Sequence, residues 1–295
     1  IVEEEFVPVT SFIHTFKVER SRRTFHSSTE PTGEDAFYEN TYLQEGASND
    51  STIALSVKNV FGISLLEGFH KYAKAGLTAY VSHNFNRYTL MNMDTSLPRP
   101  TPLEYTEHEF YVGGELSKRQ GSLLHYNVTG EVGLAGKAAG QFKVNGDIDL
   151  NFRLGKDTVN FYARGHVSNR LPSFYMRHYH SNHFAWDNDN MSKEFRTGVE
   201  GELNIQQWRT NLKVGMENIK NYTYFDQHAL PAQHGGNIQV LAAMLKQDFK
   251  LGIFHLDNEV TWQKSSNETI LPLPDLSLYH NVYLLTKLFK VLTLQ

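Results

Sequence analysis

Histidine and carboxylate side chains are concentrated between residues 178 and 189. His178, His180 and His183 come first, and Asp187 and Asp189 follow. Imidazole and carboxylate both bind divalent metals, so this segment could hold a metal ion. Its spacing matches no zinc signature, and a calcium loop would need a glycine at its sixth position and a closing glutamate. We favour a polar loop that folds over a larger structure, and the sequence leaves metal binding by residues 178–189 open.

Pairs of acidic residues recur two positions apart, at Asp147 and Asp149 and again at Glu200 and Glu202. Glycosidases also use two carboxylates, but these flank the scissile bond. Residues two apart on a strand share one face, and basic residues lie nearby, which favours a wall of ion pairs. The sequence contains no Gly-x-Ser-x-Gly elbow, no glycine-rich phosphate loop and no cysteine. We therefore predict no enzyme activity, no catalytic residue and no cofactor.

The segments that carry these side chains alternate between apolar and polar residues. From Phe142 to Leu154 every second residue is apolar or glycine, and those between are charged or amides. Side chains of a strand point to opposite faces in turn, so this pattern predicts a strand with one apolar face. About twelve such segments occur, each near the ~10 residues of a tilted membrane-spanning strand. The sequence thus predicts an all-β chain with long strands.

Long and tight connections follow one another along the chain. The expected long links are residues 26–50, 92–104, 169–192, 221–235 and 265–276, and 136–140 is short where a long link is due. Antiparallel up-and-down barrels of bacterial outer membranes show this alternation. Residues 238–245 could form a short helix, but glycines before and after them favour a strand. We expect an up-and-down transmembrane β-barrel of about 12 or more strands.

Composition excludes several classes of protein. The 295 residues carry 28 basic and 32 acidic side chains, for a net charge of −4, and nucleic-acid binders are normally basic. No apolar run approaches the ~20 residues of a membrane-spanning helix. We therefore expect no nucleic-acid partner.

The alternating strands need two environments, and either lipid and a wet lumen or a sheet core and water would serve. Strand length, aromatic residues near strand ends and dense charge on the polar faces favour the membrane. A soluble β-sandwich that binds carbohydrate through its aromatics is the less favoured alternative. The aromatics expected at the lipid boundary are Phe110, Phe152, Phe161, Trp208, Phe254 and Trp262. The residues expected to line the lumen are Lys143, Asp147, Asp149, Arg153, Arg164, His166, Arg196, Glu200, Glu202, Arg209, Lys213 and Glu217.

Three groups of motifs resemble the "putative porin" family of the Bacteroidota. They are Pro172–Tyr175 with Tyr179–Asn188, Leu271–Asp275 with Leu278–Asn281, and Asn49–Ser51 with Lys58–Phe69. The resemblance runs through most of the chain and implies a barrel in the bacterial outer membrane without enzyme activity. Its partners would be outer-membrane lipid and other outer-membrane proteins or lipoproteins.

Members of such a family are longer than this chain. We therefore expect residues 1–295 to form a single β-barrel domain that is an incomplete portion of the full barrel. The expected function is passive diffusion of small solutes. The alternative is a structural or docking barrel with a filled lumen inside an outer-membrane protein complex.

Overall fold

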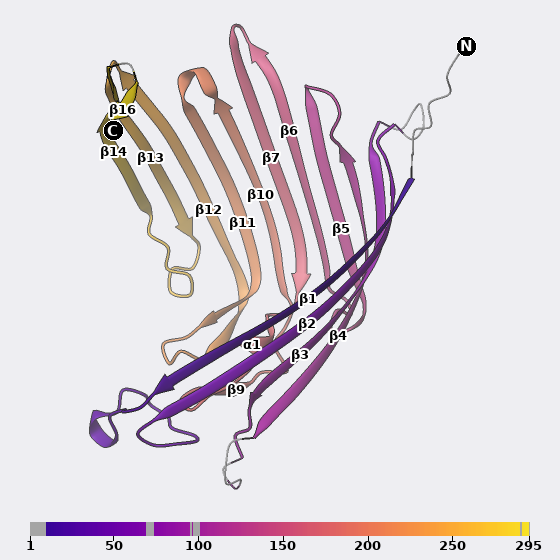
Figure 1. Ribbon diagram of the computed structural model, residues 1–295, viewed down its shortest axis with the longest axis vertical. Coiled ribbons are helices and arrows are strands. Elements are labelled where there is room, and N and C mark those ends of the chain that lie inside the picture. Colours follow the sequence, from indigo (N-terminus) through magenta and orange to yellow (C-terminus); the bar gives the residue numbers. More distant parts are fainter. Residues whose placement is uncertain (1–9, 69–73, 95, 97–100, 290, 295) are drawn as a thin grey trace.

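The computed structural model describes residues 10–68, 74–94, 96, 101–289 and 291–294, and it contains a curved antiparallel sheet of twelve strands (Figure 1). Each strand pairs with its neighbours in the sequence, apart from a short hairpin inserted between β7 and β10. The sheet strands are β1 (Thr10–Ser27), β2 (Ser48–Leu65), β3 (Gly76–Met91), β4 (Pro102–Lys118), β5 (Leu124–Gly136), β6 (Phe142–Leu154), β7 (Asp157–Arg170), β10 (Glu194–Ile205), β11 (Thr210–Phe225), β12 (Pro231–Leu251), β13 (Phe254–Ser265) and β14 (Leu276–Leu284). The predicted all-β class and strand number are confirmed.

The remaining elements are short. Two hairpins lie outside the main sheet, β8 (His178–His180) with β9 (Ala185–Asp187) and β15 (Thr286–Leu288) with β16 (Leu292–Leu294). The helical turns are η1 (Gly33–Asp35), α1 (Phe174–Arg177) and η2 (Gln206–Trp208). Among the described residues, no helix has the length and apolar character needed to cross a membrane.

Apolar side chains point away from the hollow of the sheet. On β6, Val144 and Ile148 are 45% and 44% exposed, whereas Asn145 and Asp147 beside them are half-buried. A soluble sandwich would bury its apolar face against a second sheet. All six aromatics expected at the lipid boundary are exposed, as side chains facing lipid would be in a structure without its bilayer. Large buried apolar side chains are few in the described part of the chain, so the fold has no thick dry core.

The long links lie at one end of the strands, and the connections at the other end are tight apart from residues 66–75, of which 69–73 lie outside the described residues (Figure 1). Four long links are confirmed as residues 28–47, 92–101, 171–193 and 266–275, although 95 and 97–100 lie outside the described residues. The short link after β5 is also confirmed, and residues 238–245 lie within β12 and are strand.

The predicted long link 221–235 is wrong. β11 continues to Phe225 and β12 begins at Pro231, so the connection is only residues 226–230. A register shift between Lys220 and Tyr222 accommodates Asn221, whose φ is 58°. Such a bulge lets polar residues that are typical of turns remain in a pair of strands. The polarity of residues 221–235 therefore predicted a loop where most of these residues lie in β11 and β12.

Candidate functional site

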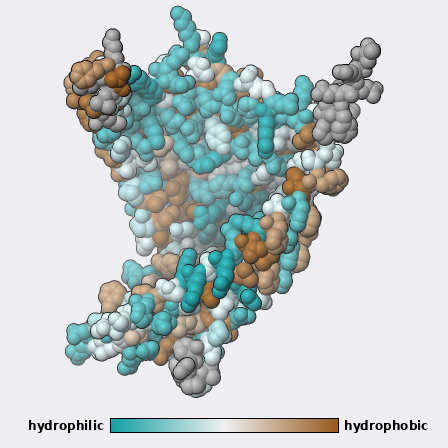
Figure 2. Space-filling view, in the orientation of Figure 1, coloured by the Kyte–Doolittle hydropathy of each residue, from teal (hydrophilic) through white to brown (hydrophobic). Residues whose placement is uncertain are grey.

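Hydrophilic side chains gather in the hollow of the curved sheet (Figure 2). A cavity of about 460 Å³ lies over the middle strands β6, β7, β10 and β11. Five of the residues expected from sequence to line a lumen surround it. They are Asp147, Arg164, His166, Glu200 and Glu217. Because alternate residues of a strand share a face, four separate strands bring these charges to one surface.

Ion pairs run across this polar wall. Arg164 Nε lies 2.9 Å from Glu200 Oε1, and Lys213 Nζ approaches the same oxygen at 2.9 Å. His166 Nε2 lies 3.2 Å from Glu217 Oε1. Strand register produces these contacts, because Glu200 lies opposite Arg164. The wall is thus made of paired charges and presents both signs to the hollow.

A glycine leaves room for one of these pairs. A Cβ atom on Gly198 would lie 2.2 Å from Glu217 Oε2 and 2.4 Å from His166 Cε1. Both distances are far below van der Waals contact. The missing side chain therefore allows His166 and Glu217 to meet over β10.

Amide groups complete the polar wall. Asp149 accepts hydrogen bonds from Asn160 at 2.6 Å and Asn151 at 2.9 Å. Glu202 accepts one from Asn211 at 2.6 Å. The acidic pairs seen in the sequence are therefore held by different partners along the wall.

The remaining predicted wall residues have different surroundings. Arg196 pairs with Glu194 on its own strand, and Lys143 lies opposite Glu131 in the register of β5 and β6. Arg153 is exposed near the end of β6. Arg209 differs from the sequence interpretation, because it lies in the turn before β11 with φ 53° and not within a strand.

Residues 171–193 fold back against the strands and form the second part of the site, here called the docked loop. The loop contains α1, β8 and β9, which lie among the long links in Figure 1. Phe174 stacks on Tyr88 of β3 with ring centroids 3.7 Å apart. Arg177 donates two hydrogen bonds, of 2.8 and 3.0 Å, to the carboxylate of Glu107 on β4. The side chains of Arg177 and Glu107 are 6% and 7% exposed, so this is a buried ion pair.

The β8–β9 hairpin brings two histidines to one carboxylate. His178 Nδ1 lies 2.8 Å from Asp187 Oδ1, and His180 Nε2 lies 2.9 Å from Asp187 Oδ2. Hairpin register places His178 opposite Asp187. The hydroxyl of Tyr105 on β4 also donates to Asp187 Oδ1, at 3.2 Å. These contacts attach the hairpin to the wall.

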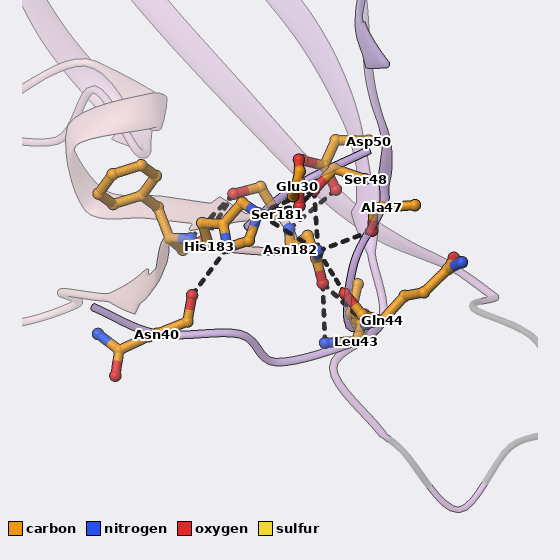
Figure 3. A network of polar contacts seen from close by, with 11 residues as sticks. Glu30, Asn40, Leu43, Gln44, Ala47, Ser48, Asp50, Ser181, Asn182 and His183 are labelled. Atoms are coloured by element: carbon orange, nitrogen blue, oxygen red, sulfur yellow. Dashed lines mark hydrogen bonds and ion pairs between the residues drawn. The ribbon is translucent and has the colours of Figure 1, made fainter. Parts of the chain in front are cut away.

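The tip of the docked loop contacts the first long link (Figure 3). Asn182 is 1% exposed, and its Oδ1 accepts hydrogen bonds from the backbone N–H groups of Leu43 and Gln44. Its own N–H donates to Asp50 Oδ1 at 2.8 Å. His183 Nε2 lies 2.9 Å from Glu30 Oε2. Three segments distant in the sequence, 28–47, β2 and 171–193, therefore meet at one polar network.

Two carboxylates that contact histidines of the docked loop, Asp187 and Glu30, have pKa values below their ordinary range. Burial opposes the ionisation of Asp187, but hydrogen bonds from His178 and His180 outweigh it and lower its pKa. Burial likewise opposes the ionisation of Glu30, and contacts with Ser48 and His183 lower its pKa overall. The imidazoles are thus paired with carboxylates that keep their negative charge. Within the described part of the chain, no group of three or more histidine or acidic side chains is placed to hold a metal ion.

Comparison with known proteins supplies the family. The model of the family described as "Putative porin" matches residues 2–295. The chain belongs to this family. No curated protein matches it in sequence.

Solved structures of outer-membrane barrels share the fold of this porin-family chain. The copper transporter OprC is 11% identical with a TM-score of 0.63, over 93% of this chain and 46% of OprC. The RagAB peptide importer is 8% identical with a TM-score of 0.54, over 88% of this chain and 35% of its own. The chain therefore spans less than half the length of these structures. Family and fold together place it in the bacterial outer membrane as a β-barrel protein.

Sequence reasoning missed most of the contacts that hold the docked loop. Glu30, Glu107 and Asn182 lie far apart in the sequence and belong to no shared motif. The resemblance to the family did include Asn182 and His183, but it gave no partner for either. Partners separated by more than a hundred positions, such as Asp50 and Asn182, become visible only when the strands are assembled.

Proposed function

We propose that this chain forms part of a porin-like barrel through which small solutes diffuse passively. The observation that supports this proposal most strongly is the polar wall, in which paired charges surround a cavity on the hollow side of the sheet. Such charges are tolerated in water, whereas an Arg or Lys against the bilayer midplane costs about 2–4 kcal/mol. We infer that the hollow is the lumen and that the predicted wall residues other than Arg209, which lies in a turn, contribute to it.

The wall would act by electrostatics and not by chemical reaction. Arg164 and Lys213 present positive charge, and Glu200 and Glu217 present negative charge on neighbouring strands. A hydrated solute would pass a transverse field that orients dipoles and admits ions of both signs. We infer a structural and electrostatic role for these residues, because they pair with one another along a strand wall.

The docked loop would narrow the path. It is attached on β3 and β4 through Tyr88 and Glu107 and contacts β11, where Trp186 lies 6.0 Å from Phe225 between ring centroids. We infer that it reaches across the inner side of the curved sheet near the long links, which in outer-membrane barrels face the exterior. Solute size would then be limited at this level.

We propose that residues 1–295 form one portion of a larger barrel. The chain spans 46% of OprC while covering almost its own full length. Barrel diameter grows with strand number, and barrels of 16–18 strands enclose an aqueous channel.

A liposome-swelling assay with uncharged sugars of increasing size tests the porin function. Full-length protein in vesicles should give swelling rates that fall steeply with sugar size. Absence of swelling with the smallest sugar, from protein that is folded and inserted, would contradict it.

A barrel with a filled lumen is the second candidate, and the docked loop favours it. If the loop and further segments block the path, the protein would serve as a structural or docking component for other outer-membrane proteins or lipoproteins. Absence of swelling, together with co-purification of one stoichiometric partner from the outer membrane, would support this candidate over the pore.

A further inference from the structure

Three arginines gather on the outer face of the sheet, the face that is turned away from the hollow. Arg20 and Arg22 lie on β1 and Arg87 lies on β3, and all three side chains are exposed. Strand register places Arg20 and Arg87 on either side of Leu55 of β2, which separates them by about 10 Å at the spacing of neighbouring strands. Arg22 is two residues from Arg20 and shares its face. Three positive charges therefore lie together over three adjacent strands (Figure 1).

The direction of these side chains follows from their neighbours. Tyr88 stacks on the docked loop, and Arg23 Cζ lies 5.5 Å from the ring centroid of Tyr175 in the same loop. Consecutive residues of a strand point to opposite faces. Arg87 and Arg22 therefore point away from the docked loop, to the face that carries the exposed apolar side chains.

The depth of the cluster can be read from β3. Leu77 lies at the end of this strand remote from the long links, and Arg87 follows ten residues later, which is about 33 Å along a strand. With the tilt of a barrel strand this corresponds to about 25 Å across the membrane, the height of the apolar band of an outer-membrane barrel. The outer-face residues between them are apolar except His83. The arginines thus lie at the edge of the apolar band, on the side of the long links, which face the exterior.

These arginines have no counter-charge of their own among the described residues. Arg22 Nε donates to Ser51 Oγ at 3.3 Å, and no carboxylate lies within ion-pair distance of Arg20, Arg22 or Arg87. Glu104 is the acidic residue of the outer face of β1–β4, and it lies one pair beyond Arg87 in the register of β3 and β4. Elsewhere in the described chain, arginines that pair with a glutamate are Arg119, Arg164, Arg170, Arg177 and Arg196. The outer-face cluster is therefore positive and free to take an anion from outside the chain.

The same strands carry an apolar groove of about 550 Å³ on the outer face, farther from the long links. Its outer-face lining includes Phe12, Phe61, Ile63, Ala79, Val81 and Val112. An acyl chain that ran down from the arginines would lie over this apolar surface. A soluble anion would gain nothing from it, so the groove favours a lipid as the ligand.

We propose that Arg20, Arg22 and Arg87 bind the phosphate group of an anionic lipid in the outer leaflet, with its acyl chains against the outer face of β1–β4. Guanidinium groups match phosphate oxygens in charge and geometry. Their apolar stems can lie along the lipid boundary while the charged ends reach the headgroups. Basic residues next to a membrane attract anionic lipids. The lipid site rests on the orientation of the barrel in the membrane and not on the proposed porin function.

The absence of cysteine from the sequence allows a single fluorescent label at the site, in full-length protein in vesicles. Thr106→Cys places a bimane label on the outer face of β4 opposite Arg87. Val144→Cys is the reference on the outer face of β6, where its strand partners are Gly130 and Val167. The vesicles are phosphatidylcholine with a minor fraction of phosphatidic acid whose brominated chains quench the label on contact. Quenching at each position is divided by that with brominated phosphatidylcholine, which corrects for general exposure to lipid.

We expect this ratio to be several-fold higher at Thr106→Cys than at Val144→Cys. Equal ratios at the two positions would overturn the lipid site. Phosphatidic acid is present in both leaflets, so the orientation of insertion does not affect the result.

Glutamine variants identify the groups responsible. Combined Arg20→Gln, Arg22→Gln and Arg87→Gln should lower the ratio at Thr106→Cys to that of the reference position. Arg23→Gln is the matched control, because it removes an arginine from the opposite face of the same strand, and the ratio should not change. Enrichment that persists in the triple variant would contradict the proposal. Quenching reports lipid contact whether or not the barrel conducts, so failure of the lipid site and failure of the pore are distinguishable.

Discussion

Arg177 is the residue whose removal should most damage the docked loop. One nitrogen of its guanidinium, Nη2, contacts both carboxylate oxygens of Glu107 in a buried pair. Truncation of one partner of such a pair leaves an uncompensated buried charge, at a cost of about 3–5 kcal/mol. Ser181 of the docked loop is 4% exposed, so Ser181→Cys should react slowly with a soluble maleimide, and in Arg177→Met we expect its labelling to be at least several-fold faster. Adding Glu107→Gln should restore part of the protection.

Arg119→Met provides the comparison for this prediction. Arg119 also pairs with a glutamate, Glu115, at 3.0 Å, but its side chain is 79% exposed. Exposed pairs contribute about 0–1 kcal/mol, so labelling should not change. Equal effects of Arg119→Met and Arg177→Met would show that burial of the Arg177 pair does not hold the loop.

Gly198 should be intolerant of any side chain. Because Gly198 has no Cβ, the side chains of His166 and Glu217 can meet above it. We expect Gly198→Ala to separate this pair and lower the midpoint of thermal unfolding, while Gly165→Ala changes it less. A Cβ on Gly165 would meet only the Gly198 backbone oxygen, at 3.5 Å. An unchanged midpoint in Gly198→Ala would show that the side chains of His166 and Glu217 move apart at no cost in stability.

At the scale of elements, the docked loop should be released in strong acid. The pKa of Asp187 is lowered in the docked state. Its stabilising contribution is therefore present above its ordinary value of 3.8 and is lost as pH falls through the lower docked value. The labelling test cannot follow this range because maleimide reacts too slowly in acid. Hydrogen exchange of the β8–β9 amides, measured from pH 5.5 to pH 2.5 and corrected for intrinsic rates, should show rising exchange below about pH 4. Protection that persists to pH 2.5 would contradict the role given to Asp187.

The elements themselves were largely predictable from the sequence, but their partners were not. Alternation of apolar and polar residues identifies strands such as β6, because the polarity of each side chain depends on the face of the strand on which it lies. The alternation of long and tight links then predicts the antiparallel order. The length of the link between β11 and β12 was overestimated. A bulge at Asn221 allows residues that are common in loops to lie within this pair of strands. The buried pair of Arg177 and Glu107 depends on where a loop settles across non-neighbouring strands, which no local pattern encodes.

At the scale of the whole molecule, two adjacent positions test which face meets lipid. Val144 and Asn145 are neighbours on β6, and Val144 is 45% exposed while Asn145 lines the cavity. Lysine at a lipid-facing position costs up to about 2–4 kcal/mol near the midplane. We expect Val144→Lys to lower the free energy of folding into lipid vesicles by such an amount, and Asn145→Lys to lower it little. Equal destabilisation by both would contradict the assignment of faces.

We propose that the polar hollow of this porin-family barrel is a path for solutes and that the docked loop narrows it. Single-channel recording of full-length protein in planar bilayers, compared with a variant in which a short Gly-Ser link replaces residues 174–190, tests it most directly. We expect discrete conducting steps for the wild type and steps several-fold larger for the shortened variant. Folded, inserted protein that shows no steps in either form would contradict it.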